Sequence, residues 1–262
     1  FGWREMFIFE GIPAVIWAII WWFSVKDKPE EVSWLSEQEK KALAAQLAKE
    51  QESIQAVGGY REAFRSRNVI FLCLQYFFWS IGVYGFVLWL PSILRDGKSM
   101  GMVEAGWLSS APYLAATIAM ILVSWASDKM QNRKLFVWPL LLVGALAFFG
   151  SWAVGTNNFW LSYSLLVVAA AAMYAPYGPF FAIIPEMLPK NVSGGAMALT
   201  NSLGALGSFF GSWFVGYLNG NTGSPAASFI FMAVSLLVSA GLTLVVRPRK
   251  AAMKPKGNVS LT

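Results

Sequence analysis

Three hydroxyl-bearing residues recur at helical spacing within one apolar stretch. Tyr76, Ser80 and Tyr84 are each separated by four residues, which places them on one face of a helix. Their hydroxyl groups could hydrogen-bond a polyol or a carboxylate, and the amide of Gln75 borders the same face. Alternatively, the tyrosine rings pack on a neighbouring helix or belong to an interfacial aromatic belt. The residues alone leave both interpretations open.

A lone amide precedes a glycine-rich stretch that reads NSLGALGSFFGSW at 201–213. Each interior glycine costs a helix in water roughly 1 kcal/mol relative to alanine, whereas in a membrane small residues let helices approach closely. We therefore interpret Gly204, Gly207 and Gly211 as a helix-packing face. An amide in hydrocarbon needs a partner, so Asn201 either contacts a ligand in a wet cavity or makes a structural bond to another helix.

Prolines interrupt another apolar run. Pro176 and Pro179 lie inside residues 158–185, and such breaks are tolerated in a membrane where a cavity or neighbouring helices satisfy the freed backbone groups. Tyr177 and Phe181 are one turn apart and are our candidates for lining such a cavity. The alternative is a kink that only shapes packing.

Charged residues at the ends of apolar runs form a further candidate group. Asp128, Arg133 and Glu186 are predicted to lie at the same membrane level. If the protein changes conformation, opposite charges there could hold helices together in an outward-open state. The alternative is that Arg133 and Lys134 only signal orientation.

The composition excludes several classes of function. The sequence has no histidine and one cysteine, Cys73, so it offers no internal disulfide, no zinc site and no histidine-based nucleophilic catalysis. It also contains no P-loop and no paired carboxylates. The net charge of +6 is not accompanied by a basic face interleaved with aromatic residues, so we expect no nucleic-acid partner. We expect no cofactor, no metal and no enzymatic activity.

The candidate residues lie in runs long enough to cross a bilayer. The chain is 56% hydrophobic and 13% charged, whereas soluble domains carry about 25% charged residues and a span needs ~20 apolar residues. The sequence predicts an all-α membrane protein with seven transmembrane helices, at about residues 5–25, 69–91, 105–127, 135–154, 158–185, 194–218 and 225–247.

Lysine and arginine predict the orientation of these spans. Most of the 20 basic residues lie in alternate connections, chiefly in 26–67 and in the tail after 247, and short cytoplasmic loops are enriched in them. The C-terminus is therefore predicted to be cytoplasmic.

The order of the segments suggests four regions. We interpret 1–25 as the last helix of an N-terminal half and 26–67 as a central cytoplasmic loop with a surface helix, begun by a capping box at Ser36 and Glu39. Residues 68–247 are predicted to form a six-helix C-terminal bundle, and 248–262 a cytoplasmic tail.

Three segments resemble the anion:cation symporter family of the major facilitator superfamily: GWREMFIFEGIPAV at 2–15, YGFVLWLPSIL at 84–94, and the run from PFFAIIPEMLP to GGAMALTNSLGALGSFFG at 179–211. The resemblance implies a carrier of about twelve spans that moves small organic anions with protons. It also implies that Tyr76, Tyr84 and Asn201 lie at the substrate cavity, and that proton-carrying acids belong to an N-terminal half absent from this chain. Residues 124–134 resemble the superfamily's loop signature between two spans, although Ser124 replaces its leading glycine and its later glycine is absent.

The resulting expectation is a multi-pass carrier in the bacterial inner membrane. It would import a sugar acid or related carboxylate by proton symport and alternating access. Alternatives are a carrier of aromatic carboxylates and a transporter-like receptor that senses such an anion without moving it.

Overall fold

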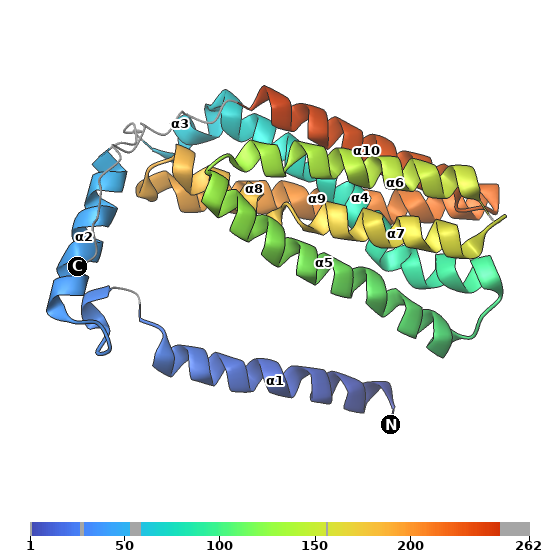
Figure 1. Ribbon diagram of the computed structural model, residues 1–262, viewed down its shortest axis with the longest axis horizontal. Helices are drawn as coiled ribbons and strands as arrows, with labels where there is room; N and C mark the ends of the chain where they lie inside the picture. Colours follow the sequence, from blue (N-terminus) through green and yellow to red (C-terminus); the bar gives the residue numbers. More distant parts are fainter. Residues whose placement is uncertain (1, 27–28, 53–58, 156, 247–262) are drawn as a thin grey trace. The chain divides into compact units, whose positions relative to one another are not determined.

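The structure is a computed structural model whose chain divides into two compact units, Phe1–Ser53 and Ile54–Thr262. It describes residues 2–26, 29–52, 59–155 and 157–246 (Figure 1). The predicted tail at 248–262 lies outside the described residues.

The first unit consists of one long apolar helix and one polar helix. Helix α1 (Trp3–Ser24) has no buried residue, and its length and composition suffice to cross a membrane. After a short 3-10 turn, η1 (Pro29–Glu31), helix α2 (Glu37–Glu52) begins with the predicted capping box. The Ser36 amide donates to Glu39 Oε2 over 2.9 Å, and the Glu39 amide donates to Ser36 Oγ over 3.3 Å. Glu37 pairs with Lys40, one turn along the helix, at 2.9 Å.

The second unit is a bundle of long helices around α4 (Figure 1). Helix α4 contacts α5, α7, α9 and α10, while α6 packs between α7 and α10. The second unit consists of α3 (Tyr60–Arg65), α4 (Arg67–Lys98), α5 (Met102–Met130), η2 (Arg133–Phe136), α6 (Trp138–Val154), α7 (Phe159–Tyr174), α8 (Tyr177–Met187), α9 (Lys190–Thr222) and α10 (Ala226–Val245).

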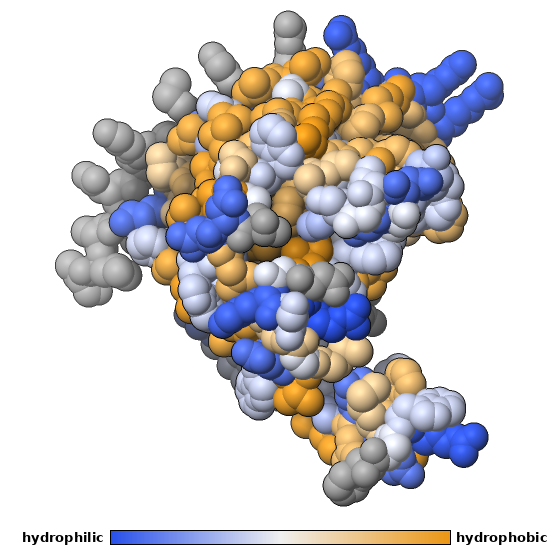
Figure 2. Space-filling model, turned by 90° about the vertical axis from the view of Figure 1, so that its right-hand side faces the viewer, coloured by the Kyte–Doolittle hydropathy of each residue, from blue (hydrophilic) through white to orange (hydrophobic). Residues whose placement is uncertain are grey.

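The surface of this bundle is apolar along its flanks and more polar at its ends. Figure 2 faces the end where α4 passes into α5, and hydrophilic residues gather there while hydrophobic side chains cover the sides. Large exposed side chains on α5 include Trp107, Leu114, Ile118 and Leu122. A helix bundle whose backbone groups are satisfied internally and whose flanks are apolar suits a lipid environment.

Six helical stretches among the described residues are long and apolar enough to span a membrane. They comprise α1, α4, α5, η2 with α6, α7 with α8, and α10. The all-helical, multi-span prediction is therefore confirmed. The remaining predicted run, 194–218, lies within α9, but α9 is not among the six stretches.

Glycines bring α9 into close contact with α4. A Cβ atom on Gly207 would overlap the backbone carbonyl oxygen of Phe77, and one on Gly211 would overlap that of Ile81. Gly204 lies in the same way against the ring of Tyr76. The backbones of α4 and α9 thus approach more closely than any larger side chain would allow.

Candidate functional site

A break in the backbone separates α7 from α8. The helix is interrupted at Ala175 and Pro176 and resumes at Tyr177, as the prolines predict, because proline has no N–H to donate and clashes with the preceding turn. The break falls near the middle of the span Phe159–Met187. Backbone irregularity at this depth is typical of binding sites in membrane carriers.

An aromatic cluster lies beside this break. The ring of Tyr76 stacks on Phe180 with centroids 5.4 Å apart and meets Phe181 edge-on at 5.1 Å. Tyr177 lies 6.2 Å from Tyr76 and 4.6 Å from Trp79. The structure therefore brings together Tyr76, Tyr177 and Phe181, three of the candidate residues, from α4 and α8.

Two tyrosines that the sequence did not single out extend the cluster. Tyr174, the last residue of α7, stacks on Tyr177 at 5.7 Å, and Tyr113 of α5 meets Tyr174 edge-on at 6.3 Å. Both are half-buried. Tyr113 is the sole tyrosine of its apolar run, so periodicity along the sequence carries no signal for it, whereas Tyr174 lies three residues before Tyr177 in the run 158–185, a spacing that could have indicated it.

Gln75 and Ser80 lie inside the bundle. Both side chains have no exposed surface, and neither the amide of Gln75 nor the hydroxyl of Ser80 has a hydrogen-bond partner among the described residues. The Gln75 backbone carbonyl accepts a hydrogen bond of 2.9 Å from Ser239 of α10. Ser80 faces the α9 seam, where its Oγ would lie 3.1 Å from a Cβ on Gly204. These two candidates thus belong to the interior of this conformation.

Tyr84 and Asn201 lie at the surface of the bundle. Tyr84 is 41% exposed and lines a groove of about 670 Å³ between α4 and α9, together with Trp89, Ser208 and Ser212. Asn201 is exposed, and its side chain makes no hydrogen bond among the described residues. An exposed amide without a partner is free to contact a ligand or another helix.

The three candidate charges meet around Arg133. Its guanidinium pairs with Asp128 at the end of α5, and its Nε donates to Glu186 of α8 over 2.9 Å. A third bond of 3.2 Å reaches the hydroxyl of Ser127. The Arg133 side chain is only 13% exposed. This cluster joins two helices of the same bundle.

Lys134 has a structural partner beside that cluster. Its ammonium group donates to the carbonyl oxygens of Leu244 and Val246 at 2.9 and 2.5 Å. These are carbonyl groups at the C-terminal end of α10, which lack partners within the helix. Lys134 therefore caps α10.

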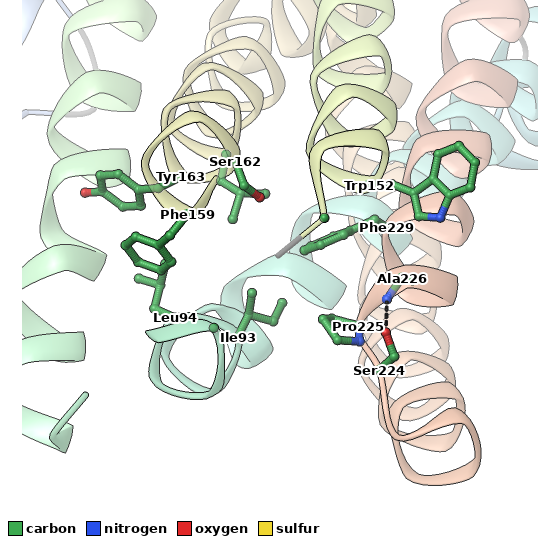
Figure 3. Close-up of a pocket in the computed structure, with 13 residues that line it drawn as sticks. Ile93, Leu94, Trp152, Phe159, Ser162, Tyr163, Ser224, Pro225, Ala226 and Phe229 are labelled. Carbon is green, nitrogen blue, oxygen red and sulfur yellow. Dashed lines mark hydrogen bonds between the residues drawn. The ribbon is translucent and has the colours of Figure 1, made fainter. Parts of the chain in front are cut away.

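A smaller pocket of about 100 Å³ lies at the opposite end of the bundle (Figure 3). Figure 3 shows Trp152, Phe159 and Phe229 around it, contributed by α6, α7 and α10. Its polar side chains already have partners, since Ser162 bonds Ser151 over 2.7 Å and Tyr163 donates to the carbonyl of Leu108 over 2.8 Å. The pocket is therefore an apolar crevice separate from the tyrosine cluster.

Comparison with known proteins gives a consistent set of relatives. The family model described as Major Facilitator Superfamily matches residues 1–211 and 97–260. The chain is 31% identical over 249 residues to a putative tartrate transporter of Agrobacterium vitis, covering 93% of this chain and 56% of the relative.

Two further relatives have similar coverage. A quinolone resistance transporter of Acinetobacter baumannii is 28% identical over 248 residues, covering 94% of this chain and 56% of its own length. A hexuronate transporter of Bacillus subtilis is 23% identical over 266 residues, covering 98% and 60% respectively. The chain spans little more than half the length of these relatives.

Proposed function

The chain belongs to the major facilitator superfamily, and from that premise we propose that it is part of a secondary carrier for a small organic anion, a sugar acid or related carboxylate. The carrier would import the anion with protons across the bacterial inner membrane by alternating access. The names of the tartrate and hexuronate relatives support an organic acid as the substrate class.

The observation that carries this proposal is the aromatic and hydroxyl cluster beside the broken helix. Tyr76, Tyr177 and Phe181 converge where α7 gives way to α8, near the middle of the spans, where carriers bind their substrates. The exposed Tyr84 and Asn201 would extend the site into the cavity, so that this bundle contributes neutral contacts to the substrate.

Charge for binding the anion would have to come from outside this cluster. Helix α4 has no ionisable acid or base between Arg67 and Arg95 apart from Cys73 and tyrosines, and α7 with α8 has no charged residue before Glu186. We propose that an N-terminal bundle of the complete carrier, of which α1 is the last helix, supplies the anion-binding cation and the proton-carrying acids.

We further propose that α9 is the seventh span. Its 33 residues correspond to about 50 Å of helix, which exceeds the ~30 Å of a hydrocarbon core. Its glycine seam against α4 supports a position inside the bundle. With seven spans, the positive-inside pattern puts the C-terminus in the cytoplasm.

Uptake by the complete carrier in sealed vesicles tests the proposal. We expect radiolabelled sugar acids or dicarboxylates to accumulate when a proton gradient is imposed and to stop accumulating when a protonophore is added. Specific binding without accumulation would support the receptor alternative. Accumulation of aromatic acids alone would identify a carrier of aromatic carboxylates, and efflux driven by the gradient would contradict import.

A further inference from the structure

We propose that the phenol hydroxyls of Tyr84, Tyr113 and Tyr174 form a hydroxyl-recognition surface, which selects hydroxylated acids over analogues that lack hydroxyl groups. This inference rests on the proposed function and assigns substrate selection to residues of α4, α5 and α7. Tyr113 and Tyr174 are in edge-on contact at 6.3 Å. Tyr84 lies about two turns along α4 from Tyr76, whose ring meets Tyr177 beside Tyr174.

The three hydroxyl groups are available to a ligand. Among the described residues, no protein group hydrogen-bonds the hydroxyl of Tyr84, Tyr113 or Tyr174, whereas Tyr163 donates to the carbonyl of Leu108 over 2.8 Å. Polar groups at membrane depth are costly to leave unsatisfied. Three such groups from three helices therefore indicate a surface that pairs with something polar.

The ring faces in this cluster are engaged by other side chains. Tyr177 stacks on Tyr174 at 5.7 Å and on Phe181 at 6.3 Å, with interplanar angles of 25° and 28°. Tyr76 stacks on Phe180 at 5.4 Å and 21°. An aromatic ligand would have to compete with these contacts, whereas a hydroxylated ligand needs only the phenol hydroxyls.

A phenol hydroxyl suits the recognition of another hydroxyl. It can both donate and accept a hydrogen bond, and the substrate's hydroxyl groups can do the same. No aspartate, glutamate, lysine or arginine lies in α5 between Glu104 and Asp128, so Tyr113 contributes hydrogen bonding without charge. Sites built to bind a hydroxyl reject analogues that lack it much more strongly than apolar sites reject an added group.

The test compares matched pairs of acids on the purified complete carrier. Tartrate and succinate differ only in two hydroxyl groups, as D-gluconate and hexanoate differ in five. We expect calorimetry to show tighter binding of the hydroxylated member of at least one pair. Tyr113→Phe and Tyr174→Phe should each weaken that binding about three- to tenfold, with binding of the unhydroxylated member unchanged.

Tyr163→Phe is the matched control, because its hydroxyl lies outside the cluster and is already bonded; it should leave the preference between the pair unchanged. Thermal unfolding of each variant separates recognition from folding. Preference for succinate and hexanoate, or an equal loss of affinity for both members of a pair in the tyrosine variants, overturns the inference while leaving transport intact. Failure of every anion to bind or accumulate instead contradicts the proposed function itself.

Discussion

The ring of Tyr76 lies directly against the α-carbon of Gly204, so that a Cβ atom at residue 204 would overlap two of its ring carbons. The same ring is held from the other side of the cluster by Phe180 and Phe181. The α4–α9 seam and the candidate site are therefore coupled through one side chain. A substitution in the seam should therefore also change the position of Tyr76 in the candidate site.

Gly204→Ala should displace Tyr76 or separate the two helices. Overpacking of a close-packed interior typically costs 1–3 kcal/mol, so we expect lower thermal stability of the purified carrier and weaker substrate binding together. Gly220→Ala is the matched control on the same helix, because nothing lies within 4 Å of a Cβ there. Equal stability of the two variants would show that a Cβ atom at residue 204 is accommodated without displacing Tyr76.

Asn201→Ala should weaken binding without weakening the fold. Its side chain is exposed and makes no hydrogen bond among the described residues, and a hydrogen bond to a charged ligand contributes roughly 1.5–3 kcal/mol. We expect about a tenfold or greater loss of affinity by calorimetry. Gly207→Leu should instead lower stability, since its side chain would meet the Phe77 backbone. A stability loss as large as that of Gly207→Leu, with binding intact, would make Asn201 a structural residue.

Arg133→Gln should uncouple α8 from the end of α5, because it removes both ion pairs of the guanidinium. Each carboxylate partner is at least half exposed, so we expect a modest loss of about 1 kcal/mol per pair at most, reduced by salt. Lys129→Gln is the control, because the Lys129 ammonium lies over the ring of Trp125.

If the cluster also acts as a latch, Arg133→Gln will change the accessibility of a cysteine placed in the cavity. Unchanged accessibility would leave it a purely structural cluster.

Lys134→Met should fray the end of α10. The ammonium group bonds two terminal carbonyl oxygens, and hydrogen bonds from charged donors contribute roughly 1.5–3 kcal/mol. Hydrogen exchange should therefore quicken at 243–246 and not at the start of α10. The same exchange rates in Lys134→Met and in the parent protein would reduce Lys134 to an orientation signal.

Cysteine labelling tests the proposed topology. Ala48 of α2 and Gly220 of α9 are exposed, whereas the native Cys73 is 2% exposed and should not react. In intact cells a membrane-impermeant maleimide should label Gly220→Cys, and Ala48→Cys only after the membrane is opened. Labelling of both positions from one side would contradict the seven-span arrangement.

Most helices could be predicted from the sequence because each apolar run is bounded by charges, glycines or prolines. The interruption at Pro176 was predictable for the same local reason. Helix α9 shows where hydropathy alone fails to identify a membrane span. Its glycines and serines lower its mean hydropathy, yet its glycines provide the close contacts that place it against α4.

The site was less predictable because its members come from different helices. Helical spacing groups Tyr76, Ser80 and Tyr84 on one helix, yet the structure buries Ser80 and exposes Tyr84. Tyr113 and Tyr174 meet only through the packing of α5 on α7. The role of Lys134 at the end of α10 depends on a contact 110 and 112 residues away, which no local pattern contains.

The composition of α9 has a consequence for biogenesis. A nascent helix passes from the translocon into lipid according to its own apolar character, and α9 is not among the stretches apolar enough to do so readily. Its partner is made earlier: Tyr84 of α4 precedes Ser212 of α9 by 128 residues, and the two are in contact. We therefore expect α9 to be retained at the translocon until α4, which is made earlier, receives it, so that its entry into the bilayer depends on a helix partner rather than on its own apolar character.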